Sequence, residues 1–370
     1  MGIEFHNDCR YWEGYRPCIN QKQGLSTGCD GCSLYSPISD NYLIIEAGGL
    51  GSILRTSVLS KELKRQNPAS QVQWLTHPSG QELLKNIPSV DGSINSEDCL
   101  ALIALQGQTF THVFNFESAP LFLSLTNTLK ASQKTGFYMN EVGKLIATED
   151  AEYFQRLQVN DNFRSIGNQK SMQQIILETA GMIWEGQNYD LSTNPIDDVA
   201  AQQVVRGLGL PDRPLVGLNI GSSAKHNAKQ WPIENFYQLA KINPGNNHLV
   251  LAGPEEESIY TQLLDIQQVS PLDNLYFVGR GQSISEFISL VNLTDQIVSA
   301  DTFGLHVGIG LRKKAISLHG PMPYQEIINY GLGQKITAGL ECSPCYSSRK
   351  SQCDNNQPLA CMNMIQPMVI

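Results

Sequence analysis

The sequence lacks any apolar run near the roughly 18 residues that a helix needs to cross a bilayer. Its first ten residues, MGIEFHNDCR, also lack the basic start and apolar stretch of a secretory signal. Basic residues are in the minority, because 26 Lys and Arg face 35 Asp and Glu and leave a formal net charge of −9. A broad basic face for nucleic acid or an anionic membrane is therefore not expected. We expect a cytoplasmic protein with no nucleic-acid partner and no transmembrane segment, and the sequence leaves an oligomer open.

The signatures of several enzyme classes are missing as well. The chain has no P-loop lysine motif, no H-E-x-x-H and no G-x-S-x-G, so phosphate-loop ATPases, zinc proteases and α/β-hydrolases lack their defining residues here. The first glycine-rich loop is GGLGS rather than G-x-G-x-x-G. The next predicted strand ends in Thr76 and His77, where a dinucleotide enzyme carries an acid that holds a ribose. A redox enzyme is therefore disfavoured.

Cysteine is scarce in the middle of the chain and crowded at both ends, with only Cys99 between the two groups. The N-terminal cysteine group comprises Cys9, Cys18, Cys29 and Cys32. The C-terminal cysteine group comprises Cys342, Cys345, Cys353 and Cys361. Each group contains one C-x-x-C pair, which in a reducing cytosol more often binds metal than forms a disulfide; the alternative is free or disulfide-linked thiols near flexible ends. We expect a structural Zn or Fe ion at these groups, since four thiolates suit both metals.

Alternating strands and helices predict an α/β protein built from two similar halves. The first half opens with a strand at 42–45, a glycine loop and a helix that stops near Pro68. It also predicts a helix over 119–131 and a strand over 134–139. The second half restarts with a strand at 214–221. It contains a helix that opens on the capping box Ser283 and Glu286.

We expect two Rossmann-like, doubly wound domains with parallel sheets and a boundary near residues 190–213. The expected divisions are a cysteine-containing segment at 1–40, domains at 41–195 and 196–340, and a second cysteine-containing segment at 341–370. Ligands of open parallel sheets bind beyond the carboxyl ends of the strands, where helix N-termini present free N–H groups. Two such clefts facing one another suit a nucleotide-linked substrate in one domain and an acceptor in the other.

Four ordered stretches carry a resemblance to a known family. They are LIIEAGGLGSILRTSVL, GLNIGSSAKHNAKQWPIENFYQLA, LVLAGPEEE and DTFGLHVGIGLRKKAISLHGP. Together they resemble glycosyltransferase family 9, the heptosyltransferases that use ADP-heptose and adopt the GT-B fold. The C-terminal cysteine group also resembles that of a family subset which glycosylates autotransporter proteins and holds an iron ion with four cysteines.

The resemblance implies that the donor binds mainly to the C-terminal domain. Lys229 would contact the donor diphosphate, and Glu256 or its neighbour Glu255 would contact the ribose. The expected donor-binding residues are Gly49, Gly51, Gly221, Lys229, Glu255, Glu256, Asp301, Thr302 and His306. A lysine and a helix N-terminus stabilise a leaving diphosphate, so no metal is expected in catalysis. Each residue also has a plain structural interpretation, as a solvated loop lysine, acids that favour a helix start, or a buried helix histidine.

The chain departs from the family at two positions. The family loop ends in Gly-Asp, and that Asp is its catalytic base, whereas Ser52 stands at the corresponding place here. A serine hydroxyl is no base near neutral pH, so Glu46, Glu117 and His306 remain as open substitutes. Phe303 replaces the family glycine after Asp301 and Thr302, and we expect it to reshape the sugar pocket.

We therefore predict an inverting glycosyltransferase that moves a heptose or related sugar from a nucleotide-diphosphate donor, ADP-heptose in the first instance. The acceptor is a hydroxyl of a glycan, a lipid-linked glycan such as the lipopolysaccharide core, or a protein. The alternative is a catalytically lapsed subunit of an assembly that binds a nucleotide sugar or a glycan.

Overall fold

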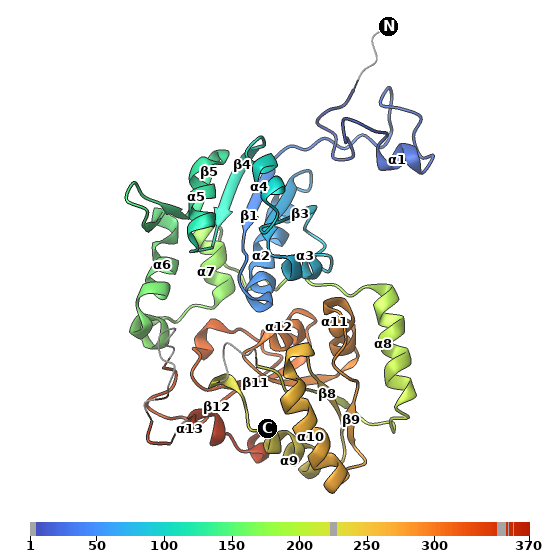
Figure 1. Ribbon diagram of the computed structural model, residues 1–370, viewed down its shortest axis with the longest axis vertical. Coiled ribbons are helices and arrows are strands. Elements are labelled where there is room, and N and C mark those ends of the chain that lie inside the picture. The colour runs from blue at the N-terminus through green and yellow to red at the C-terminus, as the bar shows by residue number, and fades with distance from the viewer. Residues whose placement is uncertain (1–4, 223–227, 346–352, 354, 358) are drawn as a thin grey trace.

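The computed structural model describes residues 5–222, 228–345, 353, 355–357 and 359–370. Within these residues the strands form two six-stranded sheets (Figure 1). The first has the order β3-β2-β1-β4-β5-β6, and the second has the order β12-β11-β10-β7-β8-β9. In each sheet the direction in which successive strands are added reverses beside the first strand of that sheet. The reversal lies between β1 and β4 in the first sheet and between β7 and β10 in the second. These two reversals are where ligands of doubly wound sheets bind.

The first domain is an α/β unit with helices on both sides of its sheet. Its elements are β1 (Asn41–Ile45), α2 (Leu50–Gln66), β2 (Gln71–Thr76), α3 (Pro78–Leu84), β3 (Gly92–Asn95), α4 (Cys99–Leu105), β4 (Thr109–Asn115), α5 (Pro120–Thr128), β5 (Lys130–Met139), β6 (Leu145–Ala147), α6 (Glu152–Val159) and α7 (Met172–Thr179). Only β5 and β6 pair antiparallel among the described strands of this sheet. Leu43, Ile44 and Ile45 are fully buried, as expected of a central strand covered on both faces.

The second domain repeats the pattern with parallel pairing throughout its described strands. Its elements are β7 (Leu215–Asn219), α9 (Ile233–Ile242), β8 (Asn247–Leu251), α10 (Glu257–Val269), β9 (Leu275–Phe277), α11 (Ile284–Leu293), β10 (Gln296–Ala300), α12 (Phe303–Gly310), β11 (Lys314–His319), β12 (Gly333–Thr337) and α13 (Ala360–Asn363). The predicted capping box at α11 is confirmed, because Ser283 Oγ accepts from the Glu286 N–H and the Glu286 carboxylate accepts from the Ser283 N–H.

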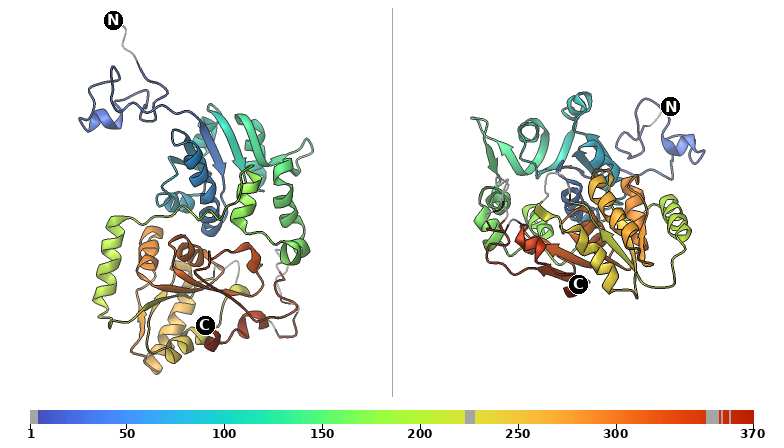
Figure 2. Two further views of the ribbon diagram at one scale, coloured as in Figure 1. Left: turned by 180° about the vertical axis from the view of Figure 1, so that it is seen from behind. Right: turned by 60° about the horizontal axis from the view of Figure 1, so that its bottom comes forward.

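The two domains face each other through the helices that follow their central strands. Helix α2, after β1, packs against α12, after β10, so the carboxyl ends of both sheets point at one interface (Figure 1). The chain passes between the domains through α8 (Pro195–Gly207), which packs against α11 (Figure 2). The predicted boundary near residues 190–213 stays a prediction. In the described parts of the chain, no helix is long and apolar enough to cross a membrane.

One predicted boundary is wrong in the first domain. The helix expected over 119–131 ends at Thr128, and β5 already begins at Lys130. Lys130 pairs with Thr109 of β4, so the backbone of this polar stretch completes the sheet instead of continuing the helix. Gly136 then adopts φ +111°, and an added Cβ there would lie 1.9 Å from the Asn115 carbonyl oxygen, which is why the strand bends at a glycine.

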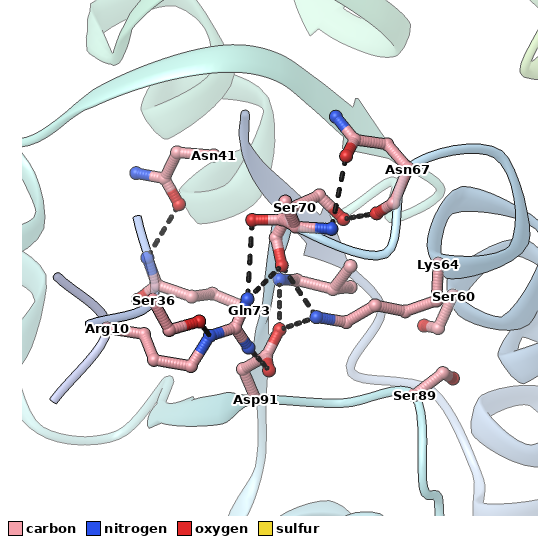
Figure 3. Close-up of polar contacts among 12 residues, drawn as sticks. Arg10, Ser36, Asn41, Ser60, Lys64, Asn67, Ser70, Gln73, Ser89 and Asp91 are labelled. Carbon is pink, nitrogen blue, oxygen red and sulfur yellow. Dashed lines mark hydrogen bonds and ion pairs between the residues drawn. The ribbon is translucent and has the colours of Figure 1, made fainter. Parts of the chain in front are cut away.

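The N-terminal segment joins the first domain through Arg10, at the edge of the sheet opposite the interface. Its guanidinium pairs with Asp91 Oδ1 at 2.9 Å and donates to Ser36 Oγ at 3.2 Å and to the Ser70 carbonyl at 3.2 Å (Figure 3). Lys64 Nζ pairs with the other Asp91 oxygen at 2.6 Å. Asp91 precedes β3, and its carboxylate therefore links the segment to the amino ends of the strands.

We predict that Arg10→Ala loosens this segment without unfolding the domains. Loss of a partly buried, charge-assisted set of hydrogen bonds costs roughly 1 to 3 kcal/mol locally. Hydrogen-exchange mass spectrometry should show faster amide exchange across residues 8–38 and little change elsewhere. Arg16→Ala is the matched control, because Arg16 lies in the same segment, is 52% exposed and pairs locally with Glu13. Equal exchange in both variants would mean that Arg10 does not hold the segment.

Candidate active site

Two glutamates meet where the first sheet reverses. Glu46 follows β1 and Glu117 follows β4, and these strands lie side by side. The Ala47 N–H donates to Glu117 Oε1 at 2.7 Å, and the Gly48 N–H donates to Glu46 Oε1 at 3.0 Å. The loop after β1 therefore holds one oxygen of each carboxyl group.

These two carboxyl groups lie close enough for the charge of Glu117 to affect the pKa of Glu46. Glu46 is 6% exposed, and burial, with the charge of Glu117 next in size, raises the pKa of Glu46 to about 8. Two adjacent carboxyls do not both ionise readily, because their charges repel in a poorly solvated site. Glu46 is therefore the member of the pair that keeps its proton near neutral pH.

Gly48 leaves open the space that three predicted catalytic residues surround. A Cβ at Gly48 would lie 2.7 Å from Glu46 Oε1, 3.4 Å from Ser52 Cβ and 3.5 Å from Glu117 Oε1. His77 stands where a dinucleotide enzyme would carry an acid. Here it fixes the glycine loop through a 2.6 Å hydrogen bond between its Nε2 and the Gly48 carbonyl. The structure thus brings Glu46, Ser52 and Glu117 together.

Asp301 lies at the corresponding reversal of the second sheet, directly after β10. Lys229 Nζ lies 3.7 Å from Asp301 Oδ2 and donates to the Asp301 carbonyl at 3.0 Å, and His306 Nε2 lies 3.3 Å from Asp301 Oδ1. Burial alone would raise the pKa of Asp301, but the charge of Lys229 and the hydrogen bond from His306 outweigh it and hold that pKa well below its usual range. The predicted donor-site residues Lys229, Asp301 and His306 therefore form one charged cluster.

His306 connects this cluster to the first domain. It is 2% exposed, and burial lowers its pKa against the opposing hydrogen bond to Asp301. A neutral ring satisfies both nitrogens, with Nε2–H donating to Asp301 and Nδ1 accepting from the Tyr189 hydroxyl at 2.9 Å. The ring lies against α2, since a Cβ at Gly51 would approach His306 Cδ2 to 2.8 Å. Gly51 is thus the point of contact between the two halves of the site.

The remaining predicted donor residues surround the ends of β7 and β10. Glu256 Oε2 accepts from the Gly253 N–H at 2.8 Å, and an added Cβ at Gly221 would lie 2.8 Å from Glu256 Oε1, so Glu256 covers the end of β7. Burial raises the pKa of Glu256. Glu255 is exposed beside it. Residues 223–227 of the predicted donor stretch lie outside the described residues.

Two of the predicted donor-binding residues cap the N-termini of helices. Thr302 is the N-cap residue of α12, and Gly49 is the exposed N-cap residue of α2. Phe303 packs its ring against Phe287 of α11, with the ring centroids 5.8 Å apart. Its neighbour Gly304 lies against Asn219, where an added Cβ would come within 2.6 Å of the amide carbon.

Three further residues of the site were not predicted. Arg55 of α2 donates from Nη2 to Ser52 Oγ at 3.2 Å, and Asn219 of β7 donates to Ser299 Oγ and Thr302 Oγ1, both at 2.8 Å. Tyr189 is the buried partner of His306. The sequence carried a signal for two of them, because Arg55 lies one helical turn after Ser52 and Asn219 is a polar residue in an apolar strand. Tyr189 lies in a connecting segment with no such signal.

Comparison with known proteins agrees with this arrangement. Residues 105–357, more than half of the chain, match the family model of glycosyltransferase family 9 (heptosyltransferase). The chain belongs to glycosyltransferase family 9. No curated protein sequence is significantly similar to it.

Solved structures of family 9 enzymes share the fold at low identity. A family 9 glycosyltransferase from Veillonella parvula DSM 2008 is 16% identical, covers 81% of this chain and 87% of its own, and gives a TM-score of 0.62. The E. coli ADP-heptose lipopolysaccharide heptosyltransferase II is 15% identical, with 89% and 95% covered and a TM-score of 0.64. These likenesses show the two-domain GT-B fold.

A third structure bears on the cysteines. TibC, an iron-containing dodecameric glycosyltransferase from enterotoxigenic E. coli H10407, is 10% identical, with 89% of this chain and 76% of its own covered and a TM-score of 0.51. In this family 9 chain, the described residues include no group of three or more His, Cys, Asp or Glu placed to hold a metal ion. Cys361 is buried, and burial together with the charges of Cys345, Cys353 and Cys342 raises its pKa to about 11. The four C-terminal thiols are thus within electrostatic reach of one another, but the predicted ions are not confirmed.

We predict that Glu46 makes the protein less stable as the pH rises. Its folded pKa of about 8 lies above the ordinary value of 4.5, so the folded state binds the proton more tightly than the unfolded chain. The stabilisation is present below pH 4.5 and is lost progressively up to pH 8, by an amount on the order of a few kcal/mol. Glu46→Gln keeps the acceptor oxygen and should flatten this fall in thermal-melting curves between pH 5 and 9. Glu141→Gln, at an exposed loop position, is the control and should follow the native curve.

Proposed function

We propose that the protein is an inverting heptosyltransferase that acts in the cytoplasm on ADP-heptose or a closely related donor. The observation that carries the proposal is that Glu46 and Glu117 in the first domain lie across one interface from the cluster of Lys229, Asp301 and His306 in the second. Membership of the heptosyltransferase family supports it, and so does the TibC structure, which was determined in complex with ADP-D-β-D-heptose.

Glu117 is the base in this proposal. As the acceptor oxygen attacks the anomeric carbon, its proton passes to Glu117, while the bond from that carbon to the diphosphate breaks and ADP leaves with the bonding electrons. Glu46 keeps its proton and therefore does not compete for that of the acceptor. The Ser52 hydroxyl is too weak a base, and both nitrogens of His306 already have partners.

The second domain supplies the positive charge that the leaving diphosphate needs. Lys229 lies over the Asp301 carbonyl, and the N-terminus of α12 begins at Phe303 directly after it. A lysine and a helix N-terminus both stabilise developing negative charge on phosphate oxygens. Glu256, which follows β8 and lies beside Gly221, would accept hydrogen bonds from ribose hydroxyls in this proposal. The chain's own groups thus provide a proton acceptor and a leaving-group site on opposite sides of one interface.

One observation favours a second candidate, a lapsed subunit that binds a nucleotide sugar or a glycan. It is Ser52 at the position where the family carries its catalytic Asp. The two candidates differ in turnover, since a lapsed subunit would bind donor and release no transfer product.

Transfer from ADP-heptose to lipopolysaccharide-core glycans and to candidate acceptor proteins, followed by product mass spectrometry, tests the proposal. We expect the native protein to transfer sugar. Glu117→Gln should lower kcat by about 10²- to 10⁴-fold, the usual contribution of a positioned base, with little change in ADP affinity. Glu141→Gln should keep the native rate. Donor binding without transfer to any acceptor would support the lapsed subunit, and an unchanged rate in Glu117→Gln would remove Glu117 from the mechanism.

We also propose that the C-terminal cysteine group binds a structural Zn or Fe ion. The donor set fits such an ion, because four thiolates suit tetrahedral Zn or Fe, and TibC is iron-containing. Elemental analysis of protein purified under reducing conditions should find one ion per chain, or two if the N-terminal cysteine group binds a second. Chelation should lower the melting temperature. Cys361→Ser should lose one ion, whereas Cys99→Ser, at an exposed position, should lose none. A metal-free native chain would contradict the proposal.

A further inference from the structure

Arg55 is a largely buried arginine at the interface of the two domains. It lies in the second turn of α2, and its side chain is 13% exposed. Nη2 donates to Ser52 Oγ at 3.2 Å, and Nη1 lies 3.9 Å from Glu326 Oε2. Its Nε atom is buried and has no hydrogen-bond partner among the described residues. A guanidinium in this setting needs more hydrogen-bond acceptors than its surroundings provide.

The acids near Arg55 are already paired with other groups. Glu326 accepts two hydrogen bonds from Arg164, at 2.5 and 2.8 Å, and is therefore neutralised by a closer cation than Arg55. Asp301 is paired with Lys229 and bonded to His306. The charge of an isolated buried guanidinium is costly unless an anion accompanies it. Among the described residues, the one carboxylate that pairs with Arg55 is therefore Glu326, at 3.9 Å, and Arg164 binds that carboxylate more closely.

The carboxylate of the glutamate pair does not fill this role. The Ala47 and Gly48 N–H groups bind the oxygens of Glu117 and Glu46. The field of Arg55 nevertheless reaches both domains: after burial and nearer partners, its positive charge is among the influences that lower the pKa of Asp301 and of His306 and that oppose the raised pKa of Glu46. Arg55 thus contributes positive charge to groups on both sides of the interface.

We infer that Arg55 binds the sugar-linked phosphate of the donor from the first-domain side, and that Ser52 holds the guanidinium in place for this contact. The inference rests on the proposed function, because it takes a nucleoside diphosphate sugar as the ligand. A guanidinium matches phosphate oxygens with two parallel N–H donors. Arg55 comes from the domain opposite Lys229, so it approaches the diphosphate from the side of the sugar and the acceptor. The role of Ser52 is then to accept a hydrogen bond from Arg55, and it does not act as a base.

The contact acts on the bond that breaks during transfer. The sugar-linked phosphate carries the oxygen that leaves the anomeric carbon, and this oxygen gains negative charge as the bond breaks. Arg55 stabilises that charge without exchanging a proton, since a guanidinium stays protonated throughout the working pH range. The first domain would thereby contribute to donor binding as well as to acceptor activation.

Calorimetric titration with ADP and with AMP as probes tests the inference on the full chain. The native protein should bind ADP more tightly than AMP. Arg55→Gln should weaken ADP binding by roughly 10- to 100-fold and AMP binding much less, because AMP lacks the second phosphate. The ADP affinity of Arg55→Lys should lie between those of the native protein and Arg55→Gln. Arg65→Gln is the matched control, since Arg65 lies on the same helix, is 66% exposed and pairs with Glu62.

Ser52→Asp supplies a second readout that does not depend on removing Arg55. A carboxylate at this position would pair with the guanidinium and withdraw it, so ADP affinity should fall toward that of Arg55→Gln. If Ser52 instead marks a lost base, Ser52→Asp should raise the transfer rate and leave ADP affinity unchanged, which would overturn the inference.

The outcomes separate this inference from the proposed function. A native chain that transfers sugar while Arg55→Gln keeps the native ratio of ADP to AMP affinity would overturn the role of Arg55 alone. If the native protein transfers no sugar but Arg55→Gln still abolishes the preference for ADP over AMP, the transferase proposal is overturned and the phosphate contact is retained. A native chain that binds neither nucleotide would overturn both. Melting temperatures of each variant identify any loss of fold, in which case Ser52→Asp decides.

Discussion

The contact between Gly51 and His306 is the constraint on which the rest of the site depends. A side chain at Gly51 would collide with the histidine ring, as the 2.8 Å approach of an added Cβ to Cδ2 shows. Only a residue without a side chain lets α2 and α12 approach this closely. Because each helix follows the central strand at which its sheet reverses, the close approach brings the two reversals face to face. In the proposed function, the glutamates of one sheet and the Asp301 cluster of the other then act on the same substrate.

The two sides of the interface manage buried charge in different ways. On the first-domain side, burial and the charge of Glu117 raise the pKa of Glu46, so this buried group keeps its proton and needs no counter-ion. On the second-domain side, Asp301 stays ionised because Lys229 and His306 compensate its burial. In the proposed function, Glu117 then accepts the proton of the acceptor, and Lys229 stabilises the leaving diphosphate. These are the complementary properties that glycosyl transfer requires.

The α/β fold class and elements such as the capped helix α11 were predicted well, because both depend on local patterns. Buried runs such as 43–45 and the capping box at Ser283 and Glu286 specify their elements without reference to the rest of the chain. The end of α5 was mispredicted because the pairing of Lys130 with Thr109 decides it, and that pairing is not visible in a local pattern. Tyr189 was missed for the same reason, since its partner His306 lies 117 residues away. Cysteine spacing likewise predicts possible metal ligands but does not fix the positions of their sulfur atoms.

The serine at position 52 is best understood together with its neighbours. Gly48 is already surrounded by Glu46 and Glu117, and Ser52 Cβ is the third group at that position. An acid at position 52 would place a third carboxyl beside Glu46 and Glu117, and its negative charge would raise the pKa of Glu46 further. It would also neutralise Arg55, whose Nη2 lies 3.2 Å from the serine oxygen. A neutral residue at position 52 therefore fits the glutamate pair and keeps the arginine available. In the proposed function, Glu117 acts as the base in place of the family's aspartate, and Ser52 leaves the Arg55 guanidinium without a carboxylate partner at this position.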